Sequence, residues 1–268
     1  MKFSFSTKGW HGKDFNTFLD LAKDLRFAGI ELHNIQNPLF TASDSPFAPH
    51  ATAATLRKLY EMQLSIPGID CLCDPADPEG EQKAKDEVSA VITYAGNLRI
   101  PYIRIHAAVH DEGDSSRVAA FLEWALPPCE REGVTLLLET SGLFSDTAAL
   151  RQTLDSFASD SLAALWDMYS TFFLGGEEPE TTIEHLGAYV KHVHIRDSAK
   201  NASGEVEFCL MGDGDLPVAG MLDALDSVGY GGYISYECDK GVIELFEGDY
   251  MERAADNMAR HMTASAKR

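Results

Sequence analysis

Two histidines and an arginine stand at alternate positions of one strand-like segment. In KHVHIRDS, residues 191–198, the alternation places His192, His194 and Arg196 on the same face. These polar heads would make a poor core layer, because each buried polar group needs a hydrogen-bond partner. At the end of a strand, the same side chains suit a metal site or an anion site.

Three other strand-like segments end in an acidic residue. LLLET contains Glu139, LAALWD ends at Asp167, and YISYE ends at Glu237. Each residue taken alone is more often solvated or salt-bridged, but their joint occurrence with His194 predicts one site assembled from distant parts of the chain. Three carboxylates and one imidazole suit a divalent cation such as manganese, magnesium or cobalt. The set contains no thiolate, which argues against a structural zinc site.

Strand-like and helix-like segments alternate along the whole chain. Eight short apolar, β-branched or aromatic runs have the length of strands: 2–7, 29–34, 64–73, 101–108, 134–141, 162–168, 189–198 and 232–238. Between them lie amphipathic segments with helical spacing: 14–29, 50–62, 81–96, 114–133, 146–158 and 216–229. Repeated strand–helix units favour parallel strands, and eight such strands predict an α/β fold, the (β/α)8 TIM barrel.

The length of the chain is consistent with one barrel. It has 268 residues, and one barrel needs roughly 250, so we expect a single domain over residues 1–268. An open doubly wound sheet would carry a glycine-rich turn after its first strand, but that turn reads STKGWHGKD, without G-x-G-x-x-G. The segments 34–49 and 171–181 follow strand ends and are expected to rim the active face.

Charge and hydropathy restrict the partners of the protein. The formal net charge is −20, which argues against sequence-independent binding of nucleic acid. The five cysteines lack zinc-site spacing and are interpreted as reduced thiols. The N-terminus has no apolar signal region, and no segment approaches ~18 consecutive apolar residues. We therefore expect a cytoplasmic protein that binds neither nucleic acid nor a membrane.

Four stretches together resemble the xylose isomerase-like TIM-barrel superfamily of sugar (phosphate) isomerases and epimerases. They are GIELH, LLLET, ALWDMYSTFFLGGEEPETTIEHLGAYVKHVHIRDS and MGDGDLPVAGMLDALDSVGYGGYISYE, and the match is strongest from 134 to 240. The resemblance implies one divalent metal ion, expected to be Mn²⁺ with Mg²⁺, Co²⁺ or Zn²⁺ as alternatives. It implies a carbohydrate substrate and a homodimer. The implied metal ligands are Glu139, Asp167, His194 and Glu237, and the two glutamates double as the catalytic acid/base pair.

The chain departs from the family pattern at three positions. Ser170 stands where the W-D-x-x-H motif has a substrate-contacting histidine, Lys200 stands in place of an arginine beyond H-x-H, and Cys238 replaces a common tryptophan. These differences leave the implied metal ligands intact and bear on the identity of the substrate. The MGDGD segment, 211–215, is similar to a G-x-G-D turn of the family with a structural role.

Several further residues are candidates for lining the substrate pocket. Glu31 and His33 share a face at the end of the second strand, and His106 ends the fourth. Each could instead be a hydrogen-bonded group at the barrel rim. Arg196 either binds a carboxylate or phosphate of the substrate or pairs with a neighbouring acid, Asp167 or Glu237. The predicted substrate-binding set is Glu31, His33, His106, Ser170, Arg196 and Lys200.

The implied chemistry is proton transfer next to a metal-polarised carbonyl of a ketose. One glutamate removes the proton to give an enediolate, and the other returns a proton to the opposite face of the same carbon or to the neighbouring carbon. These outcomes are epimerisation and isomerisation. The same intermediate can expel a β-hydroxyl, which would make the protein a dehydratase of a polyol ketone or shikimate-type acid. An endonuclease-like phosphodiesterase, which the acidity disfavours, and a non-catalytic sugar-binding homologue are the remaining alternatives.

Overall fold

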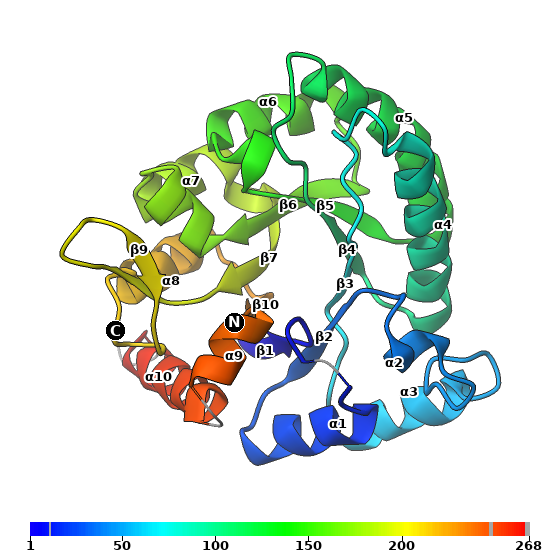
Figure 1. Cartoon of the computed structure of the whole chain (residues 1–268), viewed down its shortest axis with the longest axis horizontal. Helices are drawn as coiled ribbons and strands as arrows, with labels where there is room; N and C mark the ends of the chain where they lie inside the picture. Colours follow the sequence, from blue (N-terminus) through cyan, green and yellow to red (C-terminus); the bar gives the residue numbers. More distant parts are fainter. Residues whose placement is uncertain (11, 247–248, 266–268) are drawn as a thin grey trace.

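The chain forms a closed barrel of eight parallel strands surrounded by helices, as the sequence predicts (Figure 1). The computed structural model describes residues 1–10, 12–246 and 249–265. Around the barrel the strands follow the order β1-β10-β7-β6-β5-β4-β3-β2. The barrel strands are β1 Lys2–Ser6, β2 Gly29–His33, β3 Gly68–Asp70, β4 Tyr102–Ile105, β5 Thr135–Glu139, β6 Leu162–Asp167, β7 Val190–Ile195 and β10 Tyr233–Tyr236.

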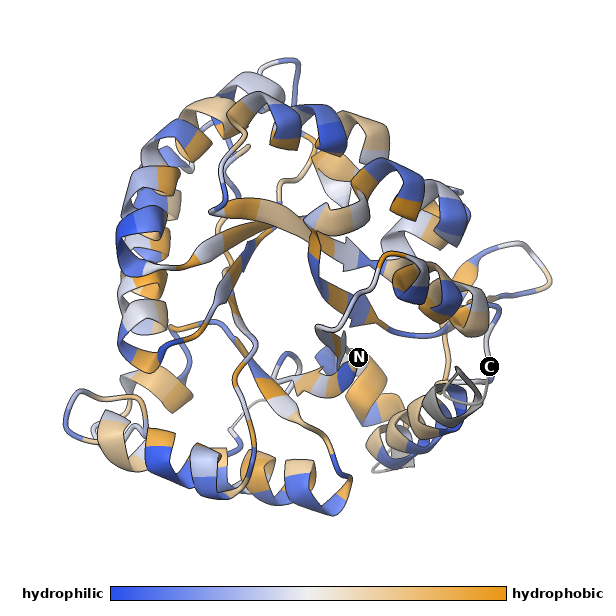
Figure 2. Cartoon of the chain, turned by 180° about the vertical axis from the view of Figure 1, so that it is seen from behind, coloured by the Kyte–Doolittle hydropathy of each residue, from blue (hydrophilic) through white to orange (hydrophobic). Residues whose placement is uncertain are grey.

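The helices turn their apolar faces toward the strands and their polar faces outward (Figure 2). In the first helix, Phe15, Phe18 and Leu19 are buried at the spacing of one helical stripe. That helix begins after Asp14, whose side chain accepts a hydrogen bond from the Thr17 amide. No helix among the described residues is long and apolar enough to cross a membrane. The helices are α1 Phe15–Asp24, α2 Pro38–Thr41, α3 Thr52–Glu61, α4 Glu81–Leu98, α5 Asp114–Glu132, α6 Thr147–Phe157, α7 Pro179–Leu186, α8 Val218–Ser227, α9 Lys240–Leu245 and α10 Asp249–Ser265.

Three features of the structure were not anticipated from the sequence. The segment 171–181, expected to be a loop, contains most of a π-helical turn, Ser170–Leu174, and the start of α7 at Pro179. Proline at the first helical position has the backbone angle that a helix start requires. After β7 the chain forms an antiparallel hairpin of β8 (Ser198–Lys200) and β9 (Val206–Phe208), which projects from the barrel (Figure 1). Two helices, α9 and α10, follow the last strand.

The MGDGD turn has a structural role. The carboxylate of Asp197 accepts hydrogen bonds from the amides of Gly212 (2.8 Å), Gly214 (3.1 Å) and Leu216 (3.3 Å). Gly212 has a φ of +91°, which favours glycine. The turn is thereby fixed to the chain just beyond β7, and this contact stabilises the segment that carries Arg196.

Candidate active site

Four residues predicted from the sequence meet inside the mouth, the barrel end where the carboxyl ends of the strands lie. Glu139 and Asp167 are the last residues of β5 and β6, and His194 lies in β7 in register with Asp167. Glu237 follows β10, and its amide donates to the carbonyl of Ile195, so strand pairing continues to this residue. All four side chains are buried.

The ligand-type atoms of these residues converge on one imidazole nitrogen. His194 Nδ1 lies 3.1 Å from Glu237 Oε2 and 3.4 Å from Glu139 Oε1. Glu139, Asp167 and His194 each have one potential ligand atom that lies within 4.8 Å of those of the other two residues. His194 Nδ1 and Glu237 Oε2 are buried without a hydrogen-bond partner, although buried polar atoms normally have one. Oxygen and imidazole donors arranged in this way could hold a divalent cation.

Below this cluster, a buried glutamate connects two histidines. Glu31 Oε1 lies 2.9 Å from His194 Nε2, and Oε2 lies 2.9 Å from His192 Nε2. Because a carboxylate accepts hydrogen bonds, His194 Nε2 carries the proton, and in the neutral ring Nδ1 then keeps its lone pair for the cluster. Glu31 was expected to bind substrate, but the structure places it beneath the four residues, only 1% exposed.

In Glu139 and Glu237, one carboxylate oxygen accepts a hydrogen bond from a basic side chain, and the other lies near His194. Arg104 Nη2 donates to Glu139 Oε2 at 2.7 Å, and Lys8 Nζ donates to Glu237 Oε1 at 2.6 Å. The free oxygens are Glu139 Oε1 and Glu237 Oε2. In the barrel order, β10 and β5 flank the β7–β6 pair, so the two glutamates come from strands on either side of this pair.

The electrostatic environment keeps both glutamates ionised. Burial would raise the pKa of Glu139, but the Arg104 guanidinium holds this pKa well below its usual range. Burial likewise acts on Glu237, yet protonated His194 and neighbouring cations lower its pKa to about 2. Burial and the Glu139 charge raise the pKa of Asp167. The chain thus gathers buried carboxylates whose charges a bound cation would neutralise.

A row of paired residues lies on the other side of the mouth. In register across β2, β3 and β4, His33 Nδ1 contacts Asp70, and Asp70 accepts a hydrogen bond from Arg104. Of these, only His33 was predicted. The strand-end rule missed Asp70 because the predicted strand 64–73 runs past it, whereas β3 ends there. Lys8 lies two residues beyond β1. Arg104 could have been found from its alternation with His106 in the sequence.

The other predicted substrate-binding residues lie at different distances from the cluster. His106 is half-buried, with Nδ1 2.7 Å from Ser141 Oγ and 3.4 Å from Glu139 Oε2. Ser170 is buried, and its amide donates to Asp167 Oδ1 at 2.8 Å. Lys200 is exposed on the β8–β9 hairpin, where its amide donates to Asp215. Within the described residues, the Lys200 ammonium forms no ion pair with the cluster.

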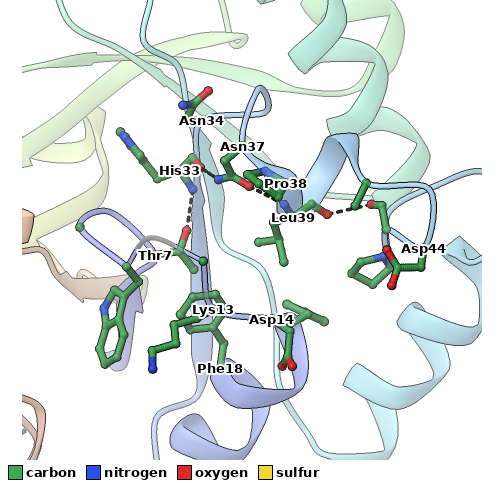
Figure 3. A pocket seen from close by; sticks show the side chains of 17 residues that line it. Thr7, Lys13, Asp14, Phe18, His33, Asn34, Asn37, Pro38, Leu39 and Asp44 are labelled. Atoms are coloured by element: carbon green, nitrogen blue, oxygen red, sulfur yellow. Dashed lines mark hydrogen bonds between the residues drawn. The ribbon is translucent and has the colours of Figure 1, made fainter.

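A cavity of about 290 Å³ opens beside His33 (Figure 3). It lies between the β1–α1 loop and the segment 34–46, which forms one wall. His33 is fixed there, because its amide donates to Thr7 Oγ1 and its carbonyl accepts from Asn37 Nδ2. The floor includes apolar side chains such as Phe18 and Leu39. His33 lines this cavity, but none of the four cluster residues does.

Comparison with known proteins identifies the family. The sequence matches the family described as xylose isomerase-like TIM barrel over residues 19–262. The chain belongs to this family. No sequence among curated proteins matches that of this xylose isomerase-like protein.

Solved structures share the fold of this family member at low sequence identity. The probable 3-DHS dehydratase AsbF from Bacillus anthracis has a TM-score of 0.80 and 15% identity, over 97% of this chain and 99% of its own. The D-psicose 3-epimerase of Clostridium cellulolyticum H10, solved with D-tagatose, has a TM-score of 0.74 and 15% identity over 97% and 99%. The IolI protein, solved with a zinc atom, has a TM-score of 0.80 and 15% identity over 98% and 99%.

Proposed function

We propose that the chain is a divalent-metal-dependent isomerase or epimerase of a sugar or sugar phosphate. The observation that carries this proposal is the convergence of Glu139 Oε1 and Glu237 Oε2 on His194 Nδ1, from β5 and from the end of β10, the strands on either side of the β7–β6 pair. Glu139, Asp167, His194 and Glu237 would hold the metal, expected to be Mn²⁺. When bound, the metal would polarise a substrate carbonyl and acidify the adjacent C–H bond.

The glutamates supply the proton transfers. One removes the proton next to the carbonyl, and the other returns a proton at the same carbon or its neighbour. Arg104 and Lys8 each hold one glutamate oxygen, so each carboxylate is fixed in orientation while its second oxygen faces the cluster. Such fixed geometry reduces the reorganisation needed during the reaction. Burial of all four residues keeps bulk water away from the transferred proton.

The dehydratase alternative uses the same first step. After proton removal, loss of a β-hydroxyl requires a proton donor at the mouth. Half-buried His33 and His106 lie there, in contact with Asp70 and Ser141 respectively. The solved structures of this fold include both a dehydratase and an epimerase by their names. The product therefore distinguishes an isomerase or epimerase from a dehydratase.

The test is an incubation of manganese-loaded protein with ketoses in D₂O, followed by NMR and mass spectrometry. The panel contains the neutral ketoses D-psicose, D-tagatose, D-fructose and L-ribulose, together with the ketouronate D-fructuronate, which carries a carboxylate. We expect deuterium at the carbon next to the carbonyl and an isomer of otherwise unchanged mass. Glu139→Gln and Glu237→Gln should each slow exchange by about 10²–10⁴-fold. Loss of water with an absorbing enone product would favour the dehydratase, and absence of exchange by the metal-loaded protein would contradict the isomerase proposal.

A further inference from the structure

Arg196 packs on a platform of two aromatic rings beside the candidate site. It follows β7, two residues beyond His194. Its guanidinium carbon lies 4.1 Å from the ring centroid of Tyr169 and 4.7 Å from that of Phe208. The two rings pack on each other, with centroids 5.5 Å apart. Contact with both ring faces restricts the orientation of the guanidinium plane.

The hydrogen-bonding capacity of Arg196 is largely unused. Its Nε is buried without a hydrogen-bond partner, and the side chain is only 16% exposed. Among the described residues its one ion pair is a 3.5 Å contact with Asp239, a half-exposed side chain. A guanidinium has five N–H donors, and a contact of this length is too long for a strong hydrogen bond. The Arg196 guanidinium is therefore held in place without acceptors for all of its N–H donors.

Comparison with Arg104 shows that burial alone does not explain why Arg196 lacks hydrogen-bond acceptors. Arg104 is 12% exposed, and it donates hydrogen bonds to the carboxylates of Asp70 and Glu139. Arg196 forms no ion pair of this kind with Asp167 or Glu237, the partners considered from the sequence. The guanidinium group of Arg196 is cationic at neutral pH.

We propose that Arg196 binds a carboxylate group of the substrate, so that the substrate is a sugar acid, such as a ketouronate, rather than a neutral or phosphorylated sugar. This inference rests on the proposed function and names its substrate class. A planar guanidinium can donate two parallel hydrogen bonds to one carboxylate. A dianionic phosphate in the same place would be repelled more strongly by Asp239 and Asp167, so a carboxylate is favoured.

The β8–β9 hairpin helps to position Arg196. Phe208 is the last residue of β9, so the hairpin supplies one ring of the platform, while the π-helical region after β6 supplies the other. Phe208 is thus a positioning residue that acts through Arg196. Replacing it with leucine should weaken carboxylate binding without changing metal content.

The test compares matched ligands that differ in charge. Shikimate and its uncharged methyl ester report on a carboxylate, and myo-inositol 1-phosphate and myo-inositol report on a phosphate. Binding to the manganese-loaded protein is measured by isothermal titration calorimetry. We expect shikimate to bind on the order of tenfold to a hundredfold more tightly than its ester, as a charge-assisted hydrogen-bonded pair provides. Arg196→Met should remove this preference, and Phe208→Leu should reduce it.

The matched control is Arg151→Met. Arg151 also packs over an aromatic ring, 5.1 Å from the Tyr189 centroid, but it lies on the exposed face of α6. This variant should keep the full preference for shikimate. Equal binding of shikimate and its ester, a preference that survives in Arg196→Met, a preference for the phosphate pair, or no binding of any probe would each overturn the inference. Circular dichroism confirms that the variants are folded.

Failure of the inference can be separated from failure of the proposed function. Metal content is measured on the same samples by inductively coupled plasma mass spectrometry. If the chain binds metal and isomerises ketoses without preferring carboxylates, only the inference is wrong. If the chain binds no metal but still shows the Arg196-dependent preference for shikimate, the proposed function is wrong and carboxylate recognition by Arg196 is supported.

Discussion

Nδ1 of His194 lies 3.1 Å from Oε2 of Glu237, and both atoms are buried without a hydrogen-bond partner. The other polar atom of each side chain is already engaged, since His194 Nε2 contacts Glu31 and Glu237 Oε1 accepts from Lys8. Without a cation, burial opposes the charge of His194, but Glu31 and Glu237 hold its pKa well above the usual range. The imidazole is then protonated at both nitrogens. A divalent cation would replace the proton on His194 Nδ1 and take this nitrogen and Glu237 Oε2 as ligands.

Glu31 should control metal affinity through His194 without touching the metal. A glutamine at this position can accept a hydrogen bond from only one of the two imidazoles, because its amide nitrogen is a donor. We expect Glu31→Gln to weaken metal binding by about 10- to 100-fold, the usual effect of losing a partner that orients a metal ligand. Competition with a fluorescent chelator measures this affinity.

The control for this variant is Glu87→Gln. Glu87 is also buried, and its Oε1 accepts a hydrogen bond from the Leu72 amide, away from the cluster. Its replacement should leave metal affinity unchanged. Equal metal affinity in Glu31→Gln and wild type would show that the hydrogen bond to His194 does not orient this ligand.

Two glycine-to-alanine substitutions should have opposite effects on stability. A methyl group at Gly214 would collide with the Asp197 carboxylate and lie 2.5 Å from the Ser198 carbonyl oxygen. Gly214→Ala should therefore lower the free energy of unfolding by about 1–3 kcal/mol. At Gly220, inside α8, nothing lies within 4 Å of the added carbon, so alanine should raise stability by up to ~1 kcal/mol. Urea unfolding measures both, and similar changes in the two variants would contradict the packing of the turn.

The contact between His110 and Asp74 should make stability depend on pH. His110 Nε2 lies 2.7 Å from Asp74 Oδ2, and this hydrogen bond raises the pKa of His110. The stabilisation is complete below the unfolded pKa of about 6.5 and is lost as the pH rises through the higher folded value. The melting temperature of wild type should exceed that of His110→Gln most in mild acid, and the two should converge in alkali. The exposed His50→Gln is the control, and a difference that grows with pH would contradict this assignment.

The barrel and the four cluster residues could be predicted because both depend on local patterns. Each strand is a short apolar run, and Glu139, Asp167 and His194 lie at or near strand ends, where parallel strands place side chains at one edge. Closure of eight strands then brings these side chains together, whatever the distance between them in the sequence.

The roles of other residues depend on tertiary contacts that the sequence pattern does not encode. Glu31 has the same alternation as His33, yet two histidines of β7 lie close enough to engage it from across the barrel. Asp167 and Glu237 were the expected acidic partners of Arg196, but its guanidinium packs on Tyr169 and on Phe208 of an unpredicted hairpin. These contacts are formed between distant elements, so only the folded chain reveals them.

The most direct test of the account is the metal content of the protein. Wild type, His194→Ala and the control His50→Ala are incubated with manganese, desalted and analysed by inductively coupled plasma mass spectrometry, with circular dichroism to confirm folding. We expect near-stoichiometric metal in wild type and in the control, and loss of the metal in His194→Ala. Equal trace amounts in all three would contradict the metal site at His194 and favour a non-catalytic sugar-binding protein.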